Sequence, residues 1–217
     1  FRRMICKKHE GKFELDLSYF VHHKGRTKIR WEGGRPEQDL IYSSKWQKLF
    51  GAPRKWGDPV TERDRNIAAS LQAAIEEIYF HVLNHLYRKA NEKNLCLAGG
   101  VAFNSVANGK ITRNTPFRNI YIPPAAGDAG TAIGAAAYVF HVIYKQPRRF
   151  VMDHASFGNV AADLEVEQVL GARGFSCWKL TEDELIQKTV TALTQGHAIG
   201  WFQGRMEFGP RALGNRS

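Results

Sequence analysis

Two glycine-rich loops, each after a short apolar run, hold the first residues of this sequence that could carry chemistry. Gly99-Gly100 follows the run at 94–98, and the loop at 127–130 follows the run at 119–122. Glycines let a backbone approach a ligand closely, and the free N–H groups at the start of the next helix attract phosphate. Because loops after consecutive parallel strands lie at one sheet edge, the spacing predicts one shared phosphate site.

Asp128 adds a carboxylate to the second loop, and Asn104 adds an amide after the first. A carboxylate at the end of a strand can bind a metal ion or polarise a nucleophile. The amide could hydrogen-bond a ribose, a phosphate or the backbone. An Asp is also a good helix N-cap, and a double glycine is also an ordinary tight turn, so structural roles stay open for both loops.

The third candidate is the arginine-rich segment 204–217, in which Arg205, Arg211 and Arg216 are interspersed with glycines. Forked guanidinium groups suit phosphate or carboxylate oxygens, although a surface turn with an Arg–Glu pair is the alternative. His81 and His85 share a helix face and could bind a metal. No HExxH pattern surrounds them, and histidines also suit a helix C-terminus, so we expect a structural role.

The elements that must position these loops alternate between helix and strand. A capping pair, Thr61 and Asp64, opens a helix predicted over 62–90, with apolar residues at helical spacing. Short apolar runs before the two loops predict buried parallel strands, and helices follow them, which indicates an α/β architecture. The other expected elements are a strand at 13–20, an ordered loop at 22–65 pinned by Trp31, Trp46 and Trp56, helices at 101–111, 131–144, 163–171 and 182–195, and a strand at 197–202.

The composition is that of a globular protein with an excess of positive charge. The 217 residues include 31 Lys and Arg against 21 Asp and Glu, a net charge of +10, which favours anionic partners. The three cysteines, Cys6, Cys96 and Cys177, form no CxxC pair, which argues against a disulfide framework and fits a reducing compartment. Cys96, within an apolar run, is expected to be buried. We find neither a membrane-length apolar stretch nor a signal peptide, and therefore expect a cytoplasmic protein.

Three stretches, 95–109, 123–136 and 200–217, together resemble the O-carbamoyltransferase family, which includes nodulation proteins and the cephem and aminoglycoside antibiotic carbamoyltransferases. The resemblance implies part of an actin/Hsp70-like (ribonuclease H-like) domain followed by the start of a second α/β, adenylating domain. The corresponding boundaries are a carbamoyl-transfer domain portion at 1–145, a linker at 146–160 and the truncated carbamoyltransferase C-terminal domain at 161–217. The chain is therefore expected to be an internal fragment that is inactive alone.

The resemblance also implies an activity. In the family a carbamoyl group moves from carbamoyl phosphate, through a carbamoyl-adenylate made with ATP, to an acceptor hydroxyl of a small molecule. It implies nucleotide binding by Gly99, Gly100, Asn104, Gly127 and Gly130, and carbamoyl phosphate binding by Arg205 and Arg211. Asp128 matches the catalytic residue that binds a divalent metal, Fe or Mg, whose other ligands lie outside this chain.

The expected partners are thus ATP, carbamoyl phosphate and a hydroxyl acceptor, with no nucleic acid and no membrane; homo-oligomer formation is left open. Two rival interpretations remain. A phosphotransferase of the actin superfamily would use similar glycine loops and an Asp but would make ADP. A non-catalytic nucleotide-binding or RNA-binding module is supported by the +10 charge alone.

Overall fold

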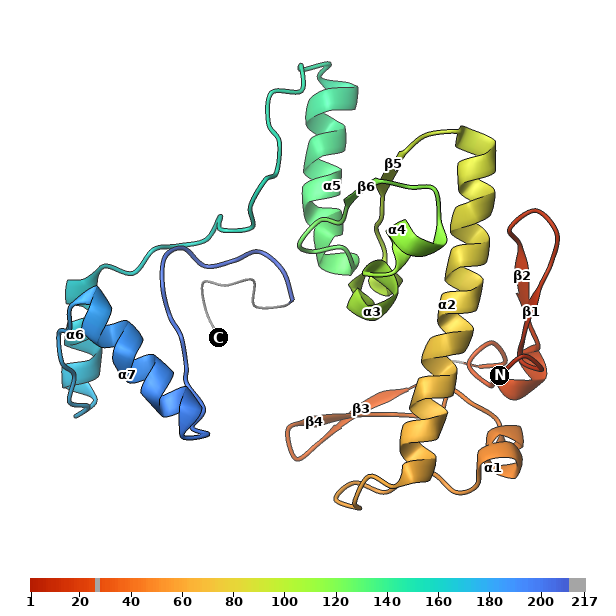
Figure 1. Cartoon of the computed structure of the whole chain (residues 1–217), viewed down its shortest axis with the longest axis horizontal. Coiled ribbons are helices and arrows are strands. Elements are labelled where there is room, and N and C mark those ends of the chain that lie inside the picture. Colours follow the sequence, from red (N-terminus) through yellow and green to blue (C-terminus); the bar gives the residue numbers. More distant parts are fainter. Residues whose placement is uncertain (26–27, 211–217) are drawn as a thin grey trace. The chain divides into compact units, whose positions relative to one another are not determined.

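The computed structural model describes residues 1–25 and 28–210 (Figure 1). The chain divides into two compact units. Unit 1 comprises residues 1–95 and 105–120, and unit 2 comprises residues 96–104 and 121–217. None of the described helices combines the length and the apolar character needed to cross a membrane.

Unit 1 is organised around one long helix, α2 (Glu62–Ala90), which confirms the predicted helix at 62–90. A capping box starts it: the Thr61 hydroxyl accepts the Asp64 N–H at 3.3 Å, and the Asp64 carboxylate accepts the Thr61 N–H at 2.9 Å. The helix ends at Asn91, which adopts the left-handed conformation (φ 52°) that commonly terminates helices. Both ends are therefore determined by local residues.

The core of unit 1 lies between α2 and two single-turn helices, α3 (Ser105–Asn108) and α4 (Ile111–Asn114). Ile111 and Phe117 are fully buried, and the Phe117 ring meets Tyr87 of α2 edge-on at 5.6 Å. Side-chain hydrogen bonds at the margin of this core join α2 to the two short helices. The Tyr79 hydroxyl donates to the Asn108 amide oxygen at 2.9 Å, and the Asn84 amide donates to the Asn114 carbonyl at 3.0 Å. The Lys110 ammonium donates to the Glu76 carboxylate at 2.7 Å. Hydrogen bonds from Gln72 and then Lys110 hold the pKa of Glu76 below its ordinary value.

The N-terminal residues form two hairpins and a short helix. β1 (Ile5–Lys7) and β2 (Phe13–Leu15) pair antiparallel, with Cys6 opposite Glu14. The predicted strand at 13–20 is wrong beyond Leu15, because the Asp16 side chain accepts the Ser18 N–H and starts a 3-10 turn, η1 (Leu17–Tyr19). A hydrogen bond from the Ser18 side chain, and then the bond from the Ser18 N–H, hold the pKa of Asp16 below its usual range.

The predicted loop at 22–65 contains regular structure that the prediction missed. β3 (Ile29–Glu32) and β4 (Arg35–Gln38) form a hairpin, and α1 (Ser44–Phe50) follows. The hairpin turn is the two-residue loop Gly33-Gly34, and its positive φ values of 56° and 78° are those that tight hairpins require.

Trp46 has the predicted pinning role. Its indole N–H donates to the Tyr19 carbonyl at 2.9 Å, and its ring packs against Phe1, Phe20, Tyr42 and Phe50. Trp31 and Trp56 are 72% and 88% exposed, so the prediction is wrong for these two.

β5 (Asn94–Cys96) and β6 (Asn119–Tyr121) form the sheet that precedes both glycine loops, although each strand is shorter than its apolar run. The prediction that both strands are buried is wrong, because Leu95 is the one buried residue in these two strands. The Lys93 carbonyl accepts from Asn119 N at 3.3 Å and the Tyr121 carbonyl from Leu97 N at 3.0 Å, so the strands run parallel. Leu95 is buried, but Cys96 is exposed, and the prediction of a buried thiol is wrong. A two-stranded sheet leaves alternate side chains uncovered.

Unit 2 contains the second glycine loop and the remaining helices. A 3-10 turn, η3 (Asp128–Gly130), leads into α5 (Thr131–Tyr138) and a π-helical turn, η4 (Val139–Ile143), over the predicted helix at 131–144.

After the first loop, η2 (Gly100–Phe103), α3 and α4 replace the single helix predicted at 101–111, because non-helical backbone at Asn104 interrupts it.

α6 (Asp163–Ala172) and α7 (Glu182–Thr194) confirm the helices predicted at 163–171 and 182–195. The strand predicted at 197–202 is wrong: the segment is irregular, with an isolated bridge at Phe202. The mixed α/β class is confirmed by this succession of helices and small sheets. The actin-like assignment and the boundaries at 145 and 161 stay predictions.

Candidate functional site

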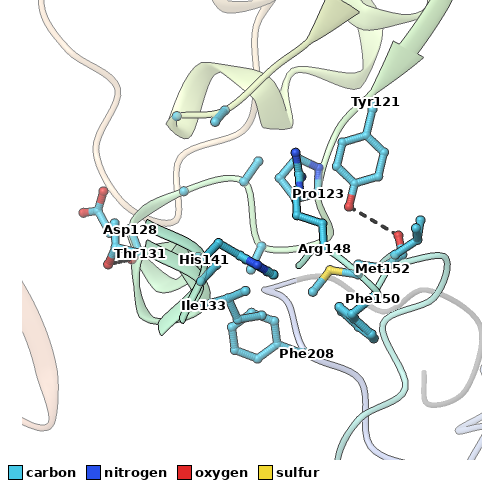
Figure 2. Close-up of a pocket in the computed structure, with 18 residues that line it drawn as sticks. Tyr121, Pro123, Asp128, Thr131, Ile133, His141, Arg148, Phe150, Met152 and Phe208 are labelled. Carbon is cyan, nitrogen blue, oxygen red and sulfur yellow. Dashed lines mark hydrogen bonds between the residues drawn. The ribbon is translucent and has the colours of Figure 1, made fainter. Parts of the chain in front are cut away.

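A pocket of about 640 Å³ in unit 2 lies at the ends of both glycine loops (Figure 2). Its glycine-loop side consists of Ala98, Gly99, Gly127, Asp128, Gly130 and Thr131. The other lining residues are Tyr121, Pro123, Ala125, Ala126, Ile133, Ala137, His141, Arg148, Phe150, Val151, Met152 and Phe208. Most of these side chains are apolar, so the pocket offers a polar end and a large apolar surface to a ligand.

Backbone contacts hold the two glycine loops together. The Gly99 N–H donates to the Ala126 carbonyl at 2.7 Å, and Gly99 has a φ of +99°, which other residues rarely adopt. A β-carbon at Gly130 would collide with the Ala125 carbonyl oxygen. The structure thus brings Gly99, Gly127 and Gly130 to one pocket, while their binding of a nucleotide stays a prediction.

Gly100 and Asn104, also predicted to bind a nucleotide, are not among the residues that line this pocket. Gly100 begins η2, and the Asn104 N–H donates to the Val101 carbonyl at 2.9 Å at the end of the same turn. Both residues therefore shape the turn that follows Gly99.

The arginine-rich segment reaches the same pocket through its backbone. Backbone hydrogen bonds join residues 206–208 to residues 155–159. The Gly158 N–H donates to the Met206 carbonyl at 2.8 Å, and the Phe208 N–H donates to the Ala155 carbonyl at 2.7 Å. Phe208 lines the pocket, and a β-carbon at Gly209 would lie 2.9 Å from the Pro124 carbonyl oxygen. All three segments singled out in the sequence therefore meet at one place in unit 2.

The two arginines predicted to bind carbamoyl phosphate are placed differently. Arg205 donates to the Gly158 carbonyl at 3.1 Å and is not a lining residue of the pocket. Arg211 lies outside the described residues. Carbamoyl phosphate binding by either arginine stays a prediction.

Asp128 stands at the start of η3, and its carbonyl accepts the Thr131 hydroxyl at 2.6 Å. The cap positions of η3 and α5 are Gly127 and Gly130, so the interpretation of Asp128 as a helix N-cap is wrong. Figure 2 shows its carboxylate at the margin of the lining residues. Within residues 1–25 and 28–210, no group of three or more His, Cys, Asp or Glu side chains could hold a metal ion.

His81 and His85 have structural contacts. The His81 Nε2 atom lies 2.9 Å from the Lys8 carbonyl and 3.1 Å from the Lys12 carbonyl, to which it can donate. The His85 side chain packs where a β-carbon at Gly11 would stand. The pair therefore ties the β1–β2 hairpin to α2, as expected for a structural pair.

Sequence reasoning missed His141 and Arg148 as lining residues. His141 lies in the η4 turn, and Arg148 lies in the segment predicted to be a linker. The Tyr121 hydroxyl donates to the Met152 carbonyl at 3.3 Å, which holds that segment against the pocket. The available signal was the apolar triplet 150–152 within the segment predicted to be a linker.

Comparison with known proteins adds an independent observation. The family model for the carbamoyltransferase N-terminus matches residues 15–137, and the model for the carbamoyltransferase C-terminus matches residues 190–217. The chain belongs to the carbamoyltransferase family. The resemblance seen in the three sequence stretches is thereby confirmed.

Several relatives of this carbamoyltransferase chain are bacterial. It is 42% identical over 99% of its length to an uncharacterized protein of Synechocystis sp., covering 34% of that protein. It is 42% identical to nodulation protein NolNO of Sinorhizobium fredii and 39% identical to nodulation protein NolO of Bradyrhizobium diazoefficiens. Each of these two matches covers 76% of this chain, but 24% and 30% of the relative. The chain thus spans about a third or less of these proteins.

Proposed function

We propose that the intact protein is an ATP-dependent O-carbamoyltransferase that acts on a hydroxyl group of a small molecule. The observation that carries the proposal is the match to both the N-terminal and the C-terminal carbamoyltransferase models. The convergence of the three chemically suggestive segments on one pocket supports it.

The proposed chemistry has two transfers. Water first hydrolyses carbamoyl phosphate to carbamate and inorganic phosphate. Carbamate then attacks the α-phosphorus of ATP, and pyrophosphate leaves to give carbamoyl-adenylate. The acceptor oxygen then attacks the carbamoyl carbon, the bond from that carbon to the AMP oxygen breaks, and AMP leaves with the electron pair. The hydroxyl proton is lost in this second transfer.

Each predicted site residue has a proposed part in this chemistry. Backbone N–H groups of the glycine loops around Gly99 and Gly127 would stabilise phosphate charge. Arg205 and Arg211 would neutralise carbamoyl phosphate. Asp128 is proposed as a ligand of a divalent metal, Fe or Mg, that acts as a Lewis acid when bound. The described residues supply no complete ligand set, so the remaining ligands would come from elsewhere in the intact protein.

The test is a product assay on the intact protein with ATP, carbamoyl phosphate and a divalent metal. Pyrophosphate and AMP that appear only with both substrates are expected. Asp128→Asn should lose most of this turnover, whereas Asp183→Asn, at an exposed carboxylate in the first turn of α7, should retain it. The asparagine is isosteric with the aspartate, so the comparison isolates the charge.

Other products would favour the rival functions. ADP in place of AMP would identify a phosphotransferase of the actin superfamily. Nucleotide binding without turnover would favour a binding module, and an RNA affinity that falls steeply with salt would identify its ligand as RNA.

A further inference from the structure

The wall of the pocket away from the glycine loops carries its own polar groups. His141 and Arg148 belong to this wall, whose other residues include Tyr121, Phe150 and Phe208. Among the lining residues, all of them described, Asp128 is the single acidic side chain. Figure 2 shows the His141 ring and the Arg148 side chain projecting toward the middle of the group, whereas Asp128 lies at its edge. The one arginine among the lining residues therefore points toward the interior, and the one carboxylate lies at the edge.

His141 is held in one orientation by the backbone that follows it. Its Nδ1 atom lies 2.9 Å from the Gln146 carbonyl oxygen, and because a carbonyl can only accept, Nδ1 carries the proton. In the neutral ring Nε2 is then the acceptor, available to a ligand hydroxyl. The ring belongs to the π-helical turn η4, and such turns occur frequently at functional sites.

The same turn aims Arg148 at the pocket. Lys145 adopts a left-handed conformation (φ 54°), and the Gln146 N–H donates to the Phe140 carbonyl at 3.1 Å, so the chain reverses directly after η4. The next residues return along the pocket and are held by the Tyr121–Met152 bond. Arg148 lines this pocket, whereas the adjacent Arg149 lines a neighbouring pocket that shares His141 and Phe150 with it.

We propose that His141 and Arg148 make this pocket a binding site for a hydroxyl-bearing organic anion. Arg148 contacts the anionic group, a phosphate or carboxylate, and His141 Nε2 accepts a hydrogen bond from the hydroxyl. The apolar body of the ligand lies against Phe150 and Phe208. A polycationic amino sugar is disfavoured, because its charges would meet Arg148.

Two sources fit this chemistry, and naming them rests on the proposed function. One is the adenine nucleotide, which carries phosphate and ribose hydroxyls. The other is an acidic carbamoyl acceptor, whose hydroxyl would receive the carbamoyl group. The arms of the experiment separate these sources by the presence or absence of the base.

The experiment is isothermal titration of the full 217-residue chain with AMP, adenosine and ribose 5-phosphate. Arg148→Gln should weaken AMP binding about three- to tenfold, as expected for one partly exposed ionic contact, and leave adenosine binding unchanged. Arg149→Gln, the matched control, should leave both unchanged. His141→Asn keeps a donor near the Gln146 carbonyl but removes Nε2, so it should weaken AMP and adenosine alike.

The ligand comparison then identifies the source. AMP binding tighter than ribose 5-phosphate assigns the pocket to the nucleotide, and equal binding assigns it to a hydroxylated acid without a base. The proposal is overturned if the unmodified chain binds neither anion, or if Arg148→Gln and Arg149→Gln act equally on AMP. Anion binding that depends on Arg148 in a protein without carbamoyl transfer would defeat the proposed function alone. Carbamoyl transfer with no Arg148 effect on binding would defeat this inference alone.

Discussion

The same methyl group, added at Gly130 or at Gly134, should change the stability of unit 2 in opposite directions. Gly130 has an ordinary helical backbone (φ −69°), so steric space and not backbone freedom decides its replacement. In Gly130→Ala the new β-carbon would overlap the carbonyl oxygen of Ala125, a buried residue whose backbone cannot move aside. Overpacking of this kind costs about 1–3 kcal/mol.

Gly134 lies within α5, and a β-carbon there meets no heavy atom within 4 Å. Gly134→Ala should therefore stabilise by up to about 1 kcal/mol, because alanine is the better helix former. The two variants should differ by roughly 1–4 kcal/mol, the sum of these opposite effects. Each is the control for the other, since both introduce alanine four residues apart.

Urea denaturation followed by circular dichroism measures the two midpoints. With a slope of about 1–3 kcal/mol per molar urea, the expected separation is on the order of 1 M. Because the chain has two units, hydrogen exchange of peptides from residues 121–144 should show that the change is confined to unit 2. A Gly130→Ala chain as stable as the unmodified one would refute the reasoning about the Ala125 carbonyl.

Three further predictions concern unit 1 and its long helix. Phe117→Ala removes a fully buried ring and should destabilise unit 1 by about 3–5 kcal/mol in urea denaturation. The control, Phe150→Ala, removes a ring of unit 2 that is 63% exposed and should cost much less. Similar losses in the two variants would contradict the assigned core. Thr61→Ala should cost about 1 kcal/mol through the lost N-cap of α2, with reduced helical ellipticity as a second readout. Hydrogen bonds from the Thr61 side chain and backbone lower the pKa of the Asp64 carboxylate in the folded state. The stabilisation that this carboxylate contributes is therefore present above about pH 4 and is lost as the pH falls through the lowered pKa of the folded state. The urea midpoint should fall from pH 5 to pH 3 less in Asp64→Asn than in the unmodified chain, and an equal fall would exclude this carboxylate as the cause.

The elements that were predicted correctly are those whose signals are local. The start of α2 could be read from Thr61 and Asp64, and the start of the helix at 182–195 has the same kind of local signal. The Thr181–Glu184 box starts α7 just as the Thr61–Asp64 box starts α2. Such residues interact within one helical turn, so the sequence contains the whole interaction.

The errors occur where the outcome depended on neighbours distant in sequence. Cys96 lies in an apolar run but is exposed, because β5 has a single partner strand and only Leu95 is covered. The segment 197–202 has an apolar character that predicted a strand, but it forms an isolated bridge at Phe202 and is otherwise irregular. The Gly33-Gly34 hairpin was a local signal that the loop prediction overlooked.

By itself the sequence determined the family, the long helix and the three segments that meet at the candidate site. Those features depend on residue order along a few turns or on motifs read directly. Only the tertiary structure decided that Arg205 bonds to the Gly158 carbonyl, that Asp128 lies at the pocket margin, and that His141 and Arg148 line its wall. The pocket joins residues from 98 to 208, and which side chains face it depends on chain reversals at Lys145 and on backbone bonds between 155–159 and 206–208. Contacts between residues this far apart in the sequence leave no periodic or local sequence pattern, because tertiary packing and not the adjacent residues determines them.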